Sequence, residues 1–194
     1  GIVEDLITEF SMMREFEILS RQTSVNFKDE KQDIKEFSKQ FNLAGKVAII
    51  TGSSKGIGKA IAKGLAENAA QVVISSRSQE ACDAVANELR AAGLKAIGIA
   101  CHIGKAAQRE NLVAQTMEAF GRIDILVNNA AINPVFGPVE EVDPAIFDKI
   151  MEVNVKAPWS LSNLVLPHLQ AHKNGSIINI ASVEALTPGF GLGI

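Results

Sequence analysis

The stretch Thr51-Gly52-Ser53-Ser54-Lys55-Gly56-Ile57-Gly58 decides the fold of this chain. It follows an apolar run that ends at Thr51, and a helical pattern begins at Gly56. Gly52 permits a tight turn, Gly56 lets the backbone approach a diphosphate, and Gly58 lets the helix pack close to the strand. The free amides of a helix N-terminus favour an anion. The turn is therefore predicted to hold the pyrophosphate of a dinucleotide; the alternative is a structural turn with incidental glycines.

Around this turn, short β-branched runs alternate with longer helical patterns from Lys46 onward. Such alternation is typical of βαβ units wound onto a parallel sheet, whose strands are buried on both faces. Right-handed crossovers give the strand order 3-2-1-4-5, so the predicted fold class is α/β, a Rossmann-type doubly wound parallel sheet. The predicted strands are residues 47–51, 71–75, 95–100, 123–128 and 176–181, and the predicted helices are 56–68, 79–92, 106–120 and 144–172.

The distribution of charge marks a boundary near Asn42. Residues 1–44 hold nine acidic and six basic side chains, whereas the rest of the chain holds thirteen of each. Apolar residues recur at helical spacing in residues 2–13 and again in residues 34–37. We interpret residues 1–42 as a helical N-terminal arm, with the remnant of a preceding domain or a disordered leader as alternatives. Residues 43–194 form the predicted dinucleotide-binding domain.

Composition excludes several other classes of partner. The net charge is −3, and Lys and Arg are scattered instead of forming the basic stripe of a nucleic-acid-binding protein. No apolar run approaches the roughly 20 residues that a membrane span needs. We expect neither nucleic acid nor a membrane as partner, and a cytoplasmic location. No metal site is predicted, because His168 and His172 have no third ligand nearby and fit a solvated helix end.

The residues about 20 positions beyond the glycine turn decide which dinucleotide binds. This place holds Ser75-Ser76-Arg77 instead of an acidic residue that would accept from a ribose hydroxyl. The Arg77 guanidinium can pair with a 2'-phosphate, and Lys55 can add a second positive charge. NADP(H) is therefore the predicted cofactor, with NAD(H) as second choice. The alternative is that Arg77 is only a solvated loop residue.

The motif TGxxxGxG resembles that of the short-chain dehydrogenase/reductase family, and the resemblance extends over residues 41–194. It includes Asn128-Asn129-Ala130-Ala131 after one predicted strand, Asn154 within Val-Asn-Val, and Ser182 after another. Within the family, residues 133–138 most resemble the dehydrogenase/reductase type 4 carbonyl reductases.

The resemblance implies roles for particular residues. Asn128 would steady the central strands, Ala130 would lie against the adenosine ribose, Asn154 would support a proton relay, and Ser182 would bind the substrate carbonyl. His102-Ile103 replaces the family's usual Asp-Val, so the carboxylate contact to the adenine amino group is missing. A neutral imidazole can still accept through one nitrogen, although a surface histidine fits equally well. The predicted cofactor-binding set is Gly52, Ser54, Lys55, Gly56, Ile57, Gly58, Ser76, Arg77, His102, Ile103, Asn128 and Ala130, and the predicted catalytic set is Ser182 and Asn154.

Asn154 also has an interpretation that comes from its neighbours. It lies four residues before Pro158, which has no amide to donate to the Asn154 carbonyl. In the resembling family, the corresponding backbone oxygen holds a water that links the active-site lysine to solvent. The alternative is a helix kinked only for packing.

Reduction of a carbonyl needs a proton donor whose pKa is lowered toward the working pH. The resembling family uses a tyrosine and, four residues later, a lysine; counted from Ser182 they would fall at positions 195 and 199. The sequence contains no tyrosine. We expect an incomplete copy of an NADP(H)-dependent oxidoreductase that interconverts a small carbonyl compound and an alcohol, without the family's last two strands. These 194 residues alone should show no turnover.

The alternatives are a non-catalytic SDR-like protein that binds a nucleotide or a partner, and a Rossmann-like methyltransferase. A methyltransferase would need an acidic ribose-binding residue and has no use for Ser182. By resemblance, the complete parent would be a homo-oligomer.

Overall fold

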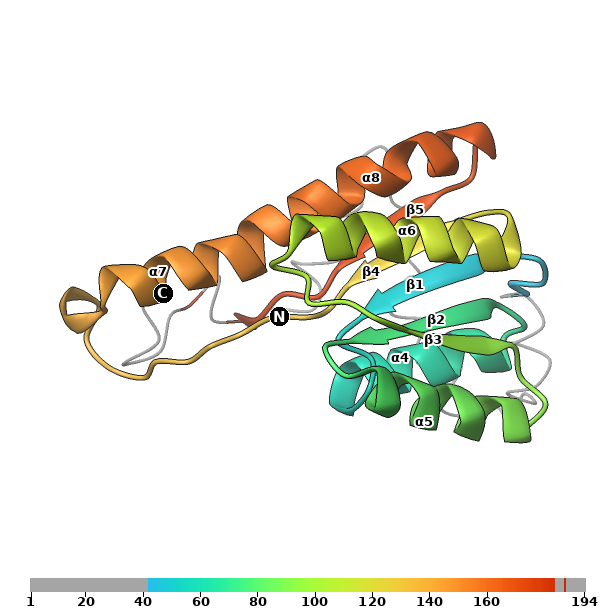
Figure 1. Ribbon diagram of the computed structural model, residues 1–194, viewed down its shortest axis with the longest axis horizontal. Coiled ribbons are helices and arrows are strands. Elements are labelled where there is room, and N and C mark those ends of the chain that lie inside the picture. Colours follow the sequence, from blue (N-terminus) through green and yellow to red (C-terminus); the bar gives the residue numbers. More distant parts are fainter. Residues whose placement is uncertain (1–41, 184–186, 188–194) are drawn as a thin grey trace, which may run out of the picture. The chain divides into compact units, whose positions relative to one another are not determined.

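A five-stranded parallel sheet organises the part of the chain that the computed structural model describes, residues 42–183 and residue 187. The strand order is β3-β2-β1-β4-β5, and every neighbouring pair is parallel, as Figure 1 shows. The predicted fold class and strand order are confirmed. The strands are β1 (Val47–Thr51), β2 (Gln71–Ser76), β3 (Ala96–Ala100), β4 (Ile125–Asn128) and β5 (Ser176–Asn179).

Helices cover both faces of the sheet (Figure 1). Helices α4 and α5 pack with Ala48 and Ile50 of β1 in one buried cluster. Helices α6 and α8 pack with Ile49 of β1 and Val73 of β2 in a second cluster on the other face. The side chains of β1 therefore alternate between two cores, which explains why a continuous apolar run forms this strand. The helices are α4 (Gly56–Glu67), α5 (Gln79–Ala91), α6 (Ala106–Phe120), α7 (Pro144–Ile150) and α8 (Ala157–Ala171), with a short 3-10 turn η2 (Val139–Glu141) before α7.

The predicted helix over residues 144–172 is interrupted by a π-helical segment, η3 (Met151–Lys156). At its end, the Ala157 amide donates to the carbonyl of Glu152, five residues back. Pro158 follows at once and has no N–H for the carbonyl of Asn154. The missing donor accompanies the wider turn, and single π segments of this kind often occur at functional sites. The other predicted elements agree with the structure to within two residues.

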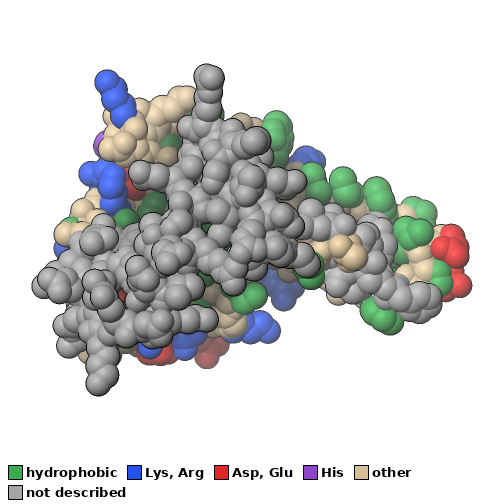
Figure 2. Space-filling model, turned by 180° about the vertical axis from the view of Figure 1, so that it is seen from behind, with side chains coloured by type: hydrophobic (Ala, Val, Ile, Leu, Met, Phe, Trp, Pro, Cys, Tyr) green, Lys and Arg blue, Asp and Glu red, His purple; other side chains and the backbone are tan. Residues whose placement is uncertain are grey.

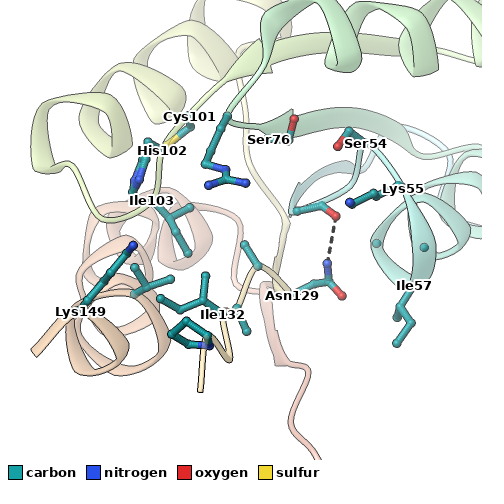
Figure 3. Close-up of a pocket in the computed structure, with 18 residues that line it drawn as sticks. Ser54, Lys55, Ile57, Ser76, Cys101, His102, Ile103, Asn129, Ile132 and Lys149 are labelled. Atoms are coloured by element: carbon teal, nitrogen blue, oxygen red, sulfur yellow. Dashed lines mark hydrogen bonds between the residues drawn. The ribbon is translucent and has the colours of Figure 1, made fainter. Parts of the chain in front are cut away.

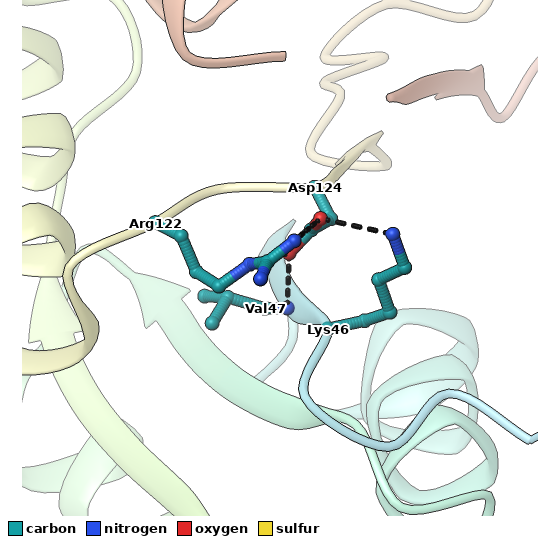
Figure 4. Close-up of polar contacts among 4 residues, drawn as sticks. All are labelled: Lys46, Val47, Arg122 and Asp124. Carbon is teal, nitrogen blue, oxygen red and sulfur yellow. Dashed lines mark hydrogen bonds and ion pairs between the residues drawn. The ribbon is translucent and has the colours of Figure 1, made fainter. Parts of the chain in front are cut away.

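A buried carboxylate fixes the beginnings of β1 and β4 relative to each other (Figure 4). Asp124 is fully buried and accepts from Arg122 Nε at 2.7 Å, from the Val47 amide at 2.9 Å and from Lys46 Nζ at 3.2 Å. Burial alone would raise the pKa of Asp124, but the hydrogen bond from Arg122 and those from Val47 and Lys46 outweigh it. The pKa of Asp124 therefore lies below its ordinary value.

Several large apolar side chains are exposed along α7, η3 and α8. Figure 2 shows hydrophobic side chains on the surface of this part of the chain. The exposed apolar residues of the three segments include Phe147, Met151, Val155 and Trp159, of which Trp159 is 65% exposed. All four residues of β5 are exposed as well. Within the described residues, the helices are too short or too polar to cross a membrane. The helices predicted for residues 2–13 and 34–37 lie outside the described part of the chain.

Candidate functional site

A cleft of about 610 Å³ opens at the carboxyl ends of the strands, beside the point where the strand order reverses between β1 and β4. Open parallel sheets bind ligands at this place because the loops there diverge to opposite faces of the sheet. The loops after β1, β2, β3 and β4 supply the lining together with α7 and η3, and Figure 3 shows the side chains of the lining. The lining consists of Gly52, Ser54, Lys55, Gly56, Ile57, Gly58, Ser76, Arg77, Cys101, His102, Ile103, Asn129, Ala130, Ala131, Ile132, Pro134, Lys149 and Val153.

The glycine turn forms one wall of the cleft with a backbone that needs glycine. Gly52 and Gly56 have φ of +67° and +56°, in the left-handed region that L side chains rarely adopt. A Cβ at Gly58 would lie 2.5 Å from the Gly52 carbonyl oxygen and 2.5 Å from Asn129 Nδ2. Helix α4 then begins without a side-chain cap and without an acidic residue in its first turn. Its first amides therefore have no side-chain acceptor and are suited to an anion.

The turn is held in place by two serines that are fully or almost fully buried. Ser53 Oγ donates to the Ile50 carbonyl at 2.6 Å and accepts from the Ser75 amide at 2.9 Å. The Ser53 amide in turn donates to the Ser75 carbonyl at 3.0 Å. These bonds fix the turn after β1 against the end of β2, which carries Ser76 and Arg77. The two segments predicted to contact the same cofactor are thereby held together.

Asn129 connects the glycine turn to β4, a role that was not among the predictions. Its Nδ2 donates to the carbonyls of Thr51 at 2.9 Å and Gly52 at 3.2 Å. Thr51 Oγ1 accepts from the amides of Asn129 at 3.0 Å and Ala130 at 3.1 Å. The place of Asn129 as the second asparagine of the Asn-Asn-Ala-Ala motif is the sequence feature that could have indicated this role.

Positive charge gathers in the cleft. The predicted residues Lys55 and Arg77 line it, and α7 contributes Lys149, which was not among the predicted residues. None of the described lining residues is Asp or Glu. An anionic ligand would therefore meet cations and helix amides without a repelling carboxylate.

The loop after β3 places His102 and Ile103 in the lining, as predicted. Ile103 is 8% exposed and belongs to the core between the sheet and α8. His102 is half-buried, and its Nδ1 accepts from the Gly104 amide at 3.2 Å. Nδ1, the nitrogen through which neutral His102 could accept a hydrogen bond, is therefore already occupied by the Gly104 amide.

Arg109 of α6 fixes this loop from behind, which the sequence did not indicate. Its side chain is 4% exposed, donates through Nη1 to the Ile103 carbonyl and through Nε to Ser160 Oγ at 3.2 Å, and lies 3.8 Å from a Glu152 carboxylate oxygen. The arginine thus links the loop after β3 to η3 and α8. Nearby, burial raises the pKa of the Cys101 thiol to about 11, although the charge of Arg109 acts in the opposite direction.

The structure places three predicted residues, Asn128, Asn154 and Ser182, outside the cleft lining. Asn128 Nδ2 donates to Asn179 Oδ1 at 2.9 Å and to Ser162 Oγ at 3.3 Å, so the side chain links β4, β5 and α8. Asn154 lies in η3 and bonds the backbone of Ile132, a lining residue, at both amide and carbonyl. Ser182 is exposed and follows the end of β5. The other eleven residues of the predicted cofactor-binding set all line the cleft.

The fold and the cleft define an α/β protein of the doubly wound parallel-sheet class, and comparison with known proteins gives the family. The short chain dehydrogenase family matches residues 46–194. The chain belongs to this family of oxidoreductases.

Two curated relatives give the scale of the similarity. The chain is 48% identical over 151 residues to dehydrogenase/reductase SDR family member 4 of Oryctolagus cuniculus, covering 78% of this chain and 58% of the relative. It is 44% identical over 149 residues to the protein of the same name from Homo sapiens, covering 77% and 54%. The chain therefore spans little more than half the length of these relatives. The expected likeness to the type 4 group is confirmed.

Two crystal structures show the same fold. A gluconate 5-dehydrogenase from Burkholderia cenocepacia J2315, in complex with NADP and tartrate, superposes with a TM-score of 0.76 at 33% identity, covering 81% of this chain and 61% of that one. A metagenomic short-chain oxidoreductase in complex with NADP superposes with a TM-score of 0.72 at 38% identity, covering 78% and 69%.

Proposed function

We propose that this chain supplies the NADP(H)-binding part of an oxidoreductase that interconverts a carbonyl and an alcohol. The observation that carries the proposal is the convergence in one cleft of the glycine turn, the uncapped start of α4 and the cations Lys55 and Arg77. Hydrogen bonds between Ser53 and Ser75 hold together the two segments predicted to contact the cofactor, the glycine turn after β1 and the end of β2.

The residues present fit a dinucleotide diphosphate. A Cβ at Gly56 would point into open space at the cleft wall, so a glycine keeps free the room that a diphosphate requires. The first amides of α4 would bind the phosphate oxygens, and Arg77 would pair with the 2'-phosphate. The NADP found in the two related crystal structures supports this choice. When bound, the nicotinamide ring would supply the hydride in carbonyl reduction and accept it in alcohol oxidation; NAD(H) remains the second choice.

The reaction also needs a proton donor near the carbonyl oxygen. Ser182 is proposed to bind that oxygen and Asn154 to support the relay of the proton. The 194 residues contain no tyrosine to act as the acid. We therefore propose that this polypeptide by itself binds the cofactor without turning over a substrate. The missing tyrosine also fits the alternative, a non-catalytic nucleotide-binding protein. A reductase assay on purified material of verified mass tests the expected inactivity, and turnover of a substrate would contradict it.

Cofactor choice is tested by titrating NADPH and NADH into the chain and into the Arg77→Ala variant. NADPH should bind at least about tenfold more tightly than NADH, because a charge-assisted contact to the 2'-phosphate contributes about 1.5–3 kcal/mol. Arg77→Ala should remove most of this ratio. Lys95→Ala is the matched control, since Lys95 is exposed and outside the cleft lining. An unchanged ratio in Arg77→Ala would show that Arg77 does not read the phosphate.

Three further expectations belong to this proposal. The substrate is a small carbonyl compound or alcohol, the complete protein is a homo-oligomer, and its location is cytoplasmic. The exposed Trp159 on α8 supports association with a second copy, because exposed apolar patches mark contact surfaces. Sedimentation of the purified protein tests association. The location needs imaging, since one curated relative, dehydrogenase/reductase SDR family member 2 of Homo sapiens, is named as mitochondrial.

A further inference from the structure

The end of the cleft that is remote from the glycine turn has its own polar groups. Figure 3 shows Ser54, Lys55 and Ile57 on one side of the cleft and His102, Ile103 and Lys149 on the other. Ile103 is 8% exposed and Val153 is 6% exposed, so both form an apolar wall there. If the diphosphate lies at the glycine turn, as the proposed function requires, the purine base of the cofactor reaches this remote end. His102 and Lys149 are then polar side chains of the lining on the side where the base would lie.

The contact between His102 and Gly104 determines which ring nitrogen carries the proton. The Gly104 amide donates to His102 Nδ1 at 3.2 Å, so Nδ1 acts as an acceptor and the neutral ring carries its proton on Nε2. In the imidazolium form Nε2 also carries a proton. Nε2 is therefore a donor in both charge states. Within residues 42–183 and 187, no carbonyl or side chain takes a hydrogen bond from it.

Lys149 adds donors of the same kind. Its ammonium group has three N–H donors and no acceptor. Figure 3 shows the side chain extending from α7 into the cleft on the side of His102 and Ile103. None of the described lining residues is Asp or Glu, so no carboxylate of the lining could accept from an amino group of a base.

We infer that His102 is a specificity-determining residue that makes the base end of the cleft read a hydrogen-bond acceptor on the purine, instead of its exocyclic amino group. A ring nitrogen of adenine satisfies a donor, and a carbonyl oxygen at the purine 6-position satisfies it equally well. This inference rests on the proposed binding of NADP(H). It predicts that the site tolerates a cofactor whose adenine is replaced by hypoxanthine, which carries a carbonyl oxygen where adenine carries its amino group.

The test compares NADPH with reduced nicotinamide hypoxanthine dinucleotide phosphate, by calorimetric titration into the full chain. The wild-type protein should bind the hypoxanthine analogue with an affinity no more than about threefold weaker than its affinity for NADPH. His102→Asp puts an acceptor in place of the donor, so it should retain NADPH but weaken the analogue about tenfold relative to it, the size of one hydrogen bond. Lys149→Met should weaken both cofactors without restoring a preference for the amino group.

Separate outcomes distinguish this inference from the proposed function. If wild-type protein binds neither cofactor, the proposed function fails. If it binds NADPH but discriminates against the analogue tenfold or more, or if His102→Asp leaves the ratio unchanged, only the inference about the base is overturned.

A measurement on the unmodified protein avoids dependence on a variant that fails to fold. Long-range proton–nitrogen NMR spectra report which nitrogen of each histidine carries the proton. With His168→Gln and His172→Gln used for assignment, His102 should show its proton on Nε2. A proton on Nδ1 of the neutral ring would overturn the inference.

Discussion

The side chain of Asn154 holds the backbone of Ile132 at both of its polar groups. Asn154 Oδ1 accepts from the Ile132 amide at 2.9 Å, and Nδ2 donates to the Ile132 carbonyl at 2.8 Å. The pair joins η3 to the loop after β4 across 22 residues of sequence. Because Ile132 lines the cleft, this contact positions the wall of the cleft as well as the π segment.

Asn154→Ala should therefore lower both stability and cofactor affinity. Two partly buried backbone groups lose their partners, which costs about 1–3 kcal/mol of unfolding free energy. Asn163→Ala on α8 is the matched control, because Asn163 is exposed, and it should change stability by less than about 0.5 kcal/mol. Urea unfolding and NADPH titration measure the two effects. Equal unfolding midpoints for the two variants would contradict the role of the contact.

Two glycines of α4 should respond in opposite ways to the same substitution. A Cβ at Gly58 would lie 2.5 Å from the backbone oxygen of Gly52, so Gly58→Ala should destabilise the fold by about 1–3 kcal/mol and distort the turn. A Cβ at Gly64 has no heavy atom within 4 Å, so Gly64→Ala should stabilise the helix by up to about 1 kcal/mol. Thermal unfolding of both variants decides. A stabilised Gly58→Ala would contradict the close packing of the turn.

The buried Asp124 should make stability depend on pH. Its pKa in the folded protein is lowered relative to the value of about 3.9 expected in the unfolded chain. The stabilisation is therefore complete above about pH 4 and is lost as the pH falls through the folded pKa.

Asp124→Asn should be less stable than wild type by about 1–3 kcal/mol near pH 7, because it weakens the bonds from Arg122 and Lys46. The gap between the two proteins should narrow below about pH 4. Urea unfolding between pH 7 and pH 3 follows this gap. A gap that widens in acid would show that the carboxylate does not stabilise the folded state in this way.

The two cysteines should be unreactive in the native protein. Both are free and buried, and burial raises the pKa of Cys101 to about 11, so at pH 8 almost none of it is thiolate. A colorimetric thiol reagent should find less than about one-tenth of the thiols in native protein within minutes, and both thiols after denaturation. Rapid labelling of native protein would mean that this side of the cleft opens readily; a Cys82→Ala variant then identifies the thiol concerned.

Local patterns predicted most of the architecture. The β-branched runs of β1 and β2 and the helical pattern after Gly56 identify their elements because burial on both faces and helical periodicity leave a direct trace in the sequence. The ends of β4 and β5 were placed up to two residues too far outward, as terminal residues carry little signal. The π segment at 151–156 was missed, although Pro158 correctly marked where regular α-helical bonding is impossible.

The residues predicted from single segments of the chain lie together in the structure. The glycine turn and the residues after β2 and β3 all line the cleft, since each follows the carboxyl end of a parallel strand. Lys149 could not be predicted, because it comes from α7 and shares the lining only through the tertiary fold. Arg109 was missed for a similar reason: a buried arginine on α6 has partners in other elements, which local periodicity does not reveal.

The sequence by itself determined the sheet order, the glycine turn and the likeness to the short-chain family, because each element and motif leaves a local pattern and the crossovers between parallel strands are right-handed. Only the tertiary structure decided which residues hold the turn in place and which ring nitrogen of neutral His102 carries the proton. Asn129 forms a hydrogen bond to Gly52 across 77 residues of sequence. The position of the Gly104 amide makes Nδ1 the accepting nitrogen of His102. Hydrogen bonds depend on distance and direction, which a residue type alone does not specify.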